Sequence, residues 1–141
     1  MTRRTIVAAG KYDIVIEQGA TFSYAITWKN SAGSKILMRD TSNAYTVRMK
    51  IKDAPGGTEI DSFIGTYNGD NTNWPSDAAI WLFGDSSNTD PTHNIQIVIN
   101  ATTTDGYDFD NGVYDVEAEN STGDVQRIIE GRVKLKHSVT K

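Results

Sequence analysis

The sequence predicts an all-β protein, an Ig-like antiparallel β-sandwich of about eight strands. Three observations lead to this prediction. Apolar and polar residues alternate along several short segments, as they do in strands that have one face on a core and one in water. Turn-forming residues recur at roughly 8–12-residue intervals. Helical periodicity is almost absent.

The first three expected strands cover residues 12–17, 22–28 and 44–52. YDIVIE and FSYAITW each alternate cleanly, and the QGAT segment between them contains a glycine that can take the positive φ of a turn or bulge. AYTVRMKIK places apolar residues on one face and basic residues on the other. The following DAPGG ends this strand, because proline and glycine interrupt strands.

The later segments are less regular until the last third. EIDSFIGTY (59–67) and AAIWLFG (78–84) are expected strands, separated by a polar loop, and NIQIVIN (94–100) has a clean apolar face. Residues 101–112 are expected to contain one helical turn. VYDVEAE and VQRIIEGRVKLKH then form a hairpin around NSTGD. Gly131 lies within the second hairpin strand, where a bulge or a covering aromatic such as Tyr114 is expected.

The predicted core consists of the residues on the apolar face of each expected strand. They are Tyr12, Ile14, Ile16, Phe22, Tyr24, Ile26, Trp28, Val47, Met49, Ile51, Ile95, Ile97, Ile99, Val133 and Leu135.

The chain of 141 residues fits one domain. We expect a single sandwich domain over residues 12–141 and a flexible N-terminal arm over residues 1–11. No apolar run approaches the ~20 residues of a membrane-spanning helix, and no export signal is visible. The absence of cysteine removes disulfides and thiolate chemistry. The net charge of −4 gives no reason to expect nucleic acid as a partner.

Residues suited to catalysis are sparse. The two histidines, His93 and His137, have no partner histidine at metal-binding spacing, and solvated surface histidines are the favoured interpretation. The acidic run DGYDFDNG fails the EF-hand pattern; a solvated turn is favoured over an irregular calcium site. No phosphate-binding loop or nucleophile motif is present. We therefore expect no enzyme and no cofactor.

Two features suggest binding surfaces. Asp70 and Asp77 flank Trp74 in the 68–77 loop, and Trp81 follows, so a carbohydrate-binding groove is an alternative to a loop held by one buried tryptophan. Acidic residues between 105 and 119 are followed by basic residues between 132 and 141. Cross-strand pairing within the hairpin is favoured for these charges over complementary patches on neighbouring copies. Arg3 and Arg4, in the arm, are better candidates for an intermolecular contact.

Parts of the chain resemble a family of small virion proteins of tailed bacteriophages. The resemblance lies in QGATF (residues 18–22), Trp28, the YTVRMKI strand (45–51), GVYD (112–115) and EGRV (130–133). It covers roughly half the chain and thins between residues 53 and 92. A looser similarity is to the N-terminal β-sandwich domain of phage upper baseplate proteins. The resemblance implies a structural component of a tail or baseplate that lacks catalytic activity.

The leading prediction is therefore a virion structural protein, made in the host cytoplasm, that binds other tail, baseplate or fibre proteins. It is expected to be homo-oligomeric in the virion and to bind neither nucleic acid nor membrane. Candidate partner-binding residues are Arg3, Arg4, Asp70, Trp74 and Asp77. The N-terminal arm, the edge strands and the long loops at 69–79 and 84–93 are the expected contact segments. A capsid decoration protein and a carbohydrate-binding module for host glycans are the alternatives.

Overall fold

The computed structural model describes residues 2–6, 10–39, 44–66, 79–84 and 93–139, with residues 2–6 described by backbone alone. This part of the chain forms ten strands and one short helix. In chain order they are β1 (Thr2–Ile6), β2 (Gly10–Lys11), β3 (Ile14–Glu17), β4 (Phe22–Trp28), β5 (Thr46–Lys52), β6 (Glu59–Thr66), β7 (Ile80–Leu82), β8 (Ile95–Ile99), α1 (Ala101–Asp105), β9 (Asn111–Glu119) and β10 (Val125–Lys136).

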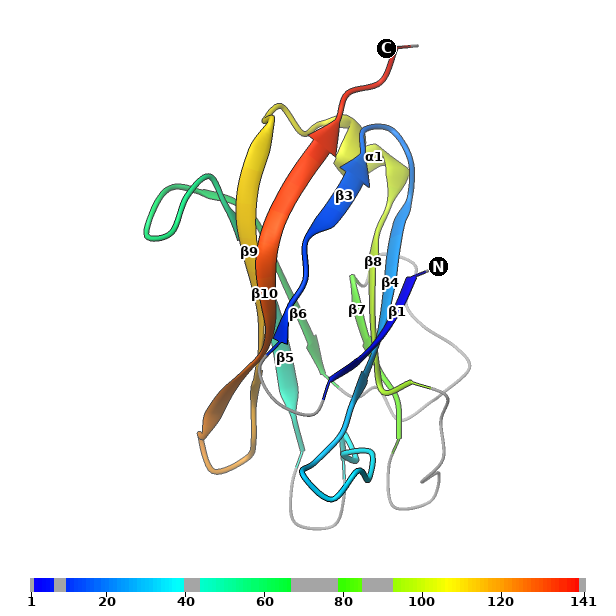
Figure 1. The fold of residues 1–141 in the computed structure, drawn as a ribbon, viewed down its shortest axis with the longest axis vertical. Helices are drawn as coiled ribbons and strands as arrows, with labels where there is room; N and C mark the ends of the chain where they lie inside the picture. Colours follow the sequence, from blue (N-terminus) through cyan, green and yellow to red (C-terminus); the bar gives the residue numbers. More distant parts are fainter. Residues whose placement is uncertain (1, 7–9, 40–43, 67–78, 85–92, 140–141) are drawn as a thin grey trace.

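The strands form two sheets that face each other, as Figure 1 shows. Sheet A has the order β1-β4-β8-β7. Sheet B has the order β2-β10-β9-β5-β6, and β3 also pairs with β10. The all-β, sandwich-like prediction is confirmed, although the strands number ten rather than about eight in the described part of the chain.

Three pairings are parallel and involve the first three strands. β1 pairs with β4 in sheet A, whereas β2 and β3 pair with β10 in sheet B. The N-terminal segment therefore passes from one sheet to the other. All other named pairings are antiparallel. Part of the predicted arm is thus paired with strands; its flexibility stays a prediction.

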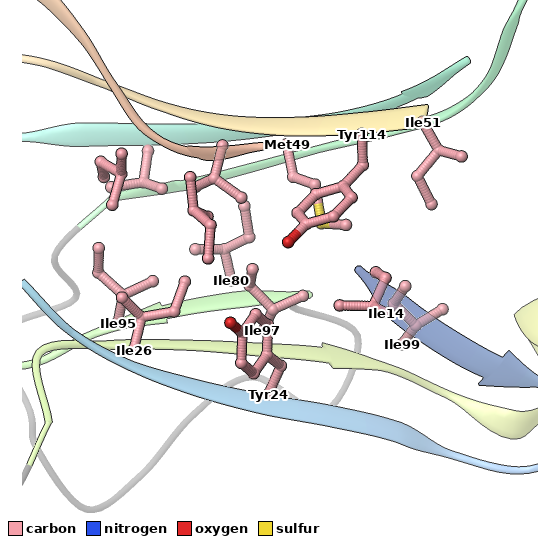
Figure 2. Packing of buried hydrophobic residues seen from close by; sticks show 14 of the residues in the cluster. Ile14, Tyr24, Ile26, Met49, Ile51, Ile80, Ile95, Ile97, Ile99 and Tyr114 are labelled. Carbon is pink, nitrogen blue, oxygen red and sulfur yellow. The ribbon is translucent and has the colours of Figure 1, made fainter. Parts of the chain in front are cut away.

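The core fills the space between the two sheets (Figure 2). Tyr24 and Ile97 approach from sheet A and Met49 and Tyr114 from sheet B; all are 3% exposed or less. The predicted core residues are buried, with two exceptions: Tyr12 and Phe22 are partly buried and pack against the cluster. Both lie at its margin, where their rings contact Tyr24 at 5.6 and 6.3 Å between centroids.

The expected helical turn and hairpin are both present. Asn100 caps α1 by accepting a hydrogen bond from Thr103 N at 2.8 Å, as short polar residues do at helix N-termini. The β9–β10 hairpin turns at Asn120–Asp124, where Gly123 has φ of +91°. This conformation favours glycine because it has no Cβ.

Candidate partner-binding surfaces

The residues predicted to bind partners fall in two parts of the chain. Arg3 and Arg4 belong to β1, an edge strand, where they are in register with Ala25 and Ile26 of β4. Asp70, Trp74 and Asp77 lie outside the described residues. Partner binding by all five residues therefore stays a prediction.

The QGATF segment connects the β3–β4 turn to α1 and to the C-terminal end of β10. Gln18 donates a hydrogen bond from Nε2 to the Tyr107 carbonyl at 2.8 Å and accepts one at Oε1 from Ser138 N at 3.0 Å. Gly19 has φ of +82° and donates its N–H to Thr104 Oγ1 at 3.1 Å. These contacts explain a glycine here and give the segment a structural role.

Trp28 is held at the end of β4 by the buried side chain of Asn94. Asn94 Oδ1 accepts from Trp28 N at 2.8 Å, and its Nδ2 donates to the carbonyls of Trp28 and Ile36 at 2.8 and 2.9 Å. The indole ring packs edge-on against Tyr45, with 5.2 Å between the centroids. One fully buried polar residue thus connects three backbone groups, of which the Trp28 carbonyl also accepts from Ile36 N at 3.0 Å.

The GVYD and EGRV segments meet where β2 leads into β3. Tyr114 donates its hydroxyl to the Tyr12 carbonyl at 2.6 Å. A Cβ on Gly131 would lie 2.1 Å from the Tyr12 carbonyl oxygen, so only glycine permits this close approach. Tyr114 and Gly131 are also in register across β9 and β10. The expected aromatic partner of Gly131 is therefore present, and both Tyr114 and Gly131 have structural roles.

The outer face of sheet B is highly charged, and four of its cations have carboxylate partners. Arg48 pairs with Glu119 at 2.9 Å, and Arg127 contacts Asp115 at 3.7 Å and Glu130 at 3.0 Å. The weaker pairs, both at 3.8 Å, are Lys50 with Glu59 and Lys136 with Glu17. These pairs are exposed enough that each contributes only about 0–1 kcal/mol to stability.

Arg127 and Asp115 form an ion pair within the hairpin, but Arg127 precedes the basic residues between 132 and 141. Of these, Lys136 pairs with Glu17 of β3 and not with β9. Arg132, however, is opposite Val113, and Lys134 is opposite Asn111. The acidic residues of β9 lie further along the strand, so the hairpin register leaves Arg132 and Lys134 without a carboxylate opposite them.

Lys52 and Arg132 lie on either side of Val113. Both are in register with it, Lys52 across β5–β9 and Arg132 across β10–β9. Among the residues that the structure describes, neither cation has a carboxylate within 4.0 Å, and the same holds for Lys134. We call Lys52, Arg132 and Lys134 the basic row. The sequence alone does not predict that Lys52 belongs to this row, because its lack of a carboxylate partner depends on the strand register.

Two shallow hollows lie beside the basic row. The larger, of about 650 Å³, extends over β5, β9 and β10 and is bordered by Lys52, Val113 and the Pro55–Gly56 turn. The smaller, of about 550 Å³, is bordered by Arg132, Lys11 and Asp13. Both have room for side chains of a partner.

The outer face of sheet A has a different composition. In β4, β7 and β8 the residues that alternate with the core residues are uncharged; they are Ser23, Ala25, Thr27, Trp81, Gln96 and Val98. Gln96 donates to Ser23 Oγ at 3.2 Å, and its Oε1 lies 3.0 Å from His93 Nε2. Trp81 is half-buried and does not belong to the core cluster. Ala25 and Thr27 are buried, and the other four are half-buried. We call these six residues the neutral face.

Two further contacts between titratable side chains occur in the described part of the chain. His137 Nε2 lies 2.8 Å from Asp110 Oδ1 at the surface. Tyr107 donates its hydroxyl to Asp61 at 2.7 Å; burial raises the pKa of this tyrosine, and the hydrogen bond to Asp61 and its charge raise it further. Within the described ranges, no three His, Asp or Glu side chains are grouped to hold a metal ion.

Comparison with known proteins gives no family assignment. No protein family matches the chain, and no curated protein matches it. In the described residues, no helix has the length and apolar character needed to cross a membrane.

Proposed function

We propose that this chain is a non-enzymatic structural protein of a tailed-bacteriophage virion. In this proposal it is a tail, baseplate or fibre-attachment module, present in several copies, that acts through protein–protein contacts. It would be made in the host cytoplasm and become part of the particle. The proposal starts from the resemblance of the QGATF, GVYD and EGRV segments to small virion proteins.

The observation that carries the proposal is the contrast between the two outer faces of the sandwich. Soluble proteins normally have charges over their surface, yet the four residues of the neutral face that solvent reaches in part, Ser23, Trp81, Gln96 and Val98, have none. The centres of protein–protein interfaces are depleted in charge and enriched in aromatic residues. In a particle that holds many copies of the chain, weak contacts of this kind would act together and stabilise the assembly.

A virion protein must be found in purified particles. We expect mass spectrometry to detect the chain in particles from the strain that carries its gene, and gold-labelled antibodies to mark the tail or its tip. Labelling of the shell alone would favour the alternative, a capsid decoration protein. Absence from purified particles, together with abundance in the lysate, would contradict both.

Trp81 supports one second candidate, a carbohydrate-binding module. Its position between Ile80 and Leu82 turns its side chain away from the core, next to Gln96 in the register of β7 and β8. An aromatic ring beside an amide suits a neutral sugar, which offers both an apolar face and hydroxyl groups. Binding to a glycan array that Trp81→Ala abolishes and Val15→Ala preserves would support this candidate.

A further inference from the structure

We propose that the basic row is a docking site for an acidic, extended segment of a partner protein. Its carboxylates would bind Lys52, Arg132 and Lys134 above Val113. This inference rests on the proposed assembly function and specifies the chemical character of one partner. The partner would bind the charged outer face of sheet B rather than the neutral face.

The first argument is the unequal distribution of ion pairs on this sheet. Arg48, Lys50, Arg127 and Lys136 each have a carboxylate within 4.0 Å. The basic row has none among the described residues, although the chain has four more acidic than basic residues. Asp13 Oδ1 accepts from the Arg132 backbone N–H at 2.9 Å but does not pair with its guanidinium. Neighbouring cations whose charged groups are unpaired repel one another and raise the energy of the free protein. An anion bound between them would remove this repulsion.

The second argument is the spacing of the cations. Val113 is in register with both Lys52 and Arg132, and directly paired residues have Cα atoms about 4.5–5.5 Å apart. One carboxylate above the valine methyls can therefore contact both cations. Lys134 lies two residues beyond Arg132, about 6.7 Å along the strand. Alternate side chains of an extended segment have the same spacing, so a second carboxylate can reach Lys134.

The surroundings favour a carboxylate segment over a polyphosphate or nucleic acid. Glu130 and Asp115 border the larger hollow, and Asp13 borders the smaller one. A uniformly charged polyanion that extends beyond the row would meet these carboxylates and be repelled. A protein segment can place neutral or basic residues there, so that only the carboxylates face the row.

The test is an NMR titration of the full chain with a synthetic octapeptide that has glutamate at alternate positions. The control peptide has glutamine in their place, and tripolyphosphate is a separate probe. At an ionic strength of about 0.01 M, where charges are little screened, we expect the glutamate peptide to shift the signals of Val113 and its neighbours. The glutamine peptide should leave them unchanged.

Variants connect the binding to the row. The double variant Lys52→Gln/Arg132→Gln should weaken binding of the glutamate peptide by about tenfold, since an exposed ion pair changes affinity by up to about fivefold. Arg39→Gln, which removes an exposed cation elsewhere, should have no effect. The variants' own spectra report whether each is folded.

Three results would overturn the proposal: no shift with the glutamate peptide, equal binding of the two peptides, or tighter binding of tripolyphosphate. The last would identify a phosphate site. None of these three results contradicts the assembly proposal, because that proposal is tested by detecting the chain in particles. Conversely, absence from particles would reject the assembly proposal without affecting the peptide result.

Discussion

Asn94 is a fully buried polar residue whose side chain connects two separate segments of the backbone. Its three hydrogen bonds reach the Trp28 N–H and the carbonyls of Trp28 and Ile36. A buried backbone group that loses its partner costs about 1–3 kcal/mol. The residue therefore fixes the end of β4 against the segment before β8.

We expect Asn94→Ala to reduce the free energy of unfolding by about 2–5 kcal/mol, because Trp28 N and the Ile36 carbonyl lose their partner and water replaces it only in part. The Trp28 carbonyl keeps its hydrogen bond from Ile36 N. Urea unfolding followed by tryptophan fluorescence measures this. Asn111→Ala is the matched control; it removes an exposed side chain in β9 and should change stability by less than about 0.5 kcal/mol. Equal effects would show that the hydrogen bonds of Asn94 contribute little.

We expect Tyr107 to make the free energy of unfolding decrease at alkaline pH. Burial, then the hydrogen bond to Asp61 and its charge, raise the pKa of Tyr107 in the folded protein. An unfolded tyrosine loses its proton near pH 10, so the folded state binds more protons above that pH. This contribution to stability is fully present below about pH 10 and is lost as pH rises, by up to about 1.4 kcal/mol per pH unit.

The measurement is urea unfolding of the wild type and Tyr107→Phe between about pH 8 and pH 11. We expect the stability of the wild type to fall more steeply above about pH 10 than that of the variant. The other five tyrosines are present in both proteins and their effects cancel in the comparison. Parallel pH profiles would contradict the assignment to Tyr107.

At the scale of elements, Gly131 sets how closely the N-terminal segment approaches β10. We expect Gly131→Ala to cost about 3 kcal/mol or more, because its Cβ would collide with the rigid backbone at Tyr12. Denaturant unfolding measures the loss. Gly106→Ala is the control: φ there is −82°, and a Cβ would lie 3.5 Å from the nearest atom. A small effect of Gly131→Ala would mean that β10 and Tyr12 separate easily.

The alternation of apolar and polar residues predicted the strands well, because buried and exposed side chains alternate in the same way along a sandwich strand. Ile14 and Ile16 face the core and Val15 is 54% exposed, as the pattern requires. The direction of a strand, in contrast, could not be predicted from this pattern. Alternation is the same in parallel and antiparallel strands, so it did not reveal that β3 runs parallel to β10. The arginines in β1 interrupt any apolar face, and that strand was not predicted.

The candidate surfaces were less predictable than the core for a physical reason. An ion pair depends on which residues are opposite each other. The register between strands that are distant in the sequence cannot be predicted from the residues of either strand alone. Arg132 was identified as basic, but its isolation follows from Val113 being opposite it. Trp81 could have been assigned to the outer face by alternation, since Ile80 and Leu82 on either side are buried.

The whole molecule is a sandwich with two unlike outer faces. The described residues of the neutral face have no charge, whereas the outer face of sheet B has several ion pairs and the basic row. Charged surface keeps a protein soluble, and uncharged surface lowers the cost of removing water on association. The assembly proposal therefore assigns the larger contact to the neutral face.

A lysine on the neutral face tests this assignment. Val98→Lys introduces a charge on β8 at a half-buried, outward position. If this position is covered in the particle, its incorporation should fall at least about tenfold, because burying an unpaired charge costs more than about 1.4 kcal/mol. Ile64→Lys adds a charge at an exposed position on sheet B outside the basic row and should be incorporated normally. Mass spectrometry of particles made with wild-type and variant chains together measures both ratios. Equal incorporation of the two variants would show that the neutral face is not the interface.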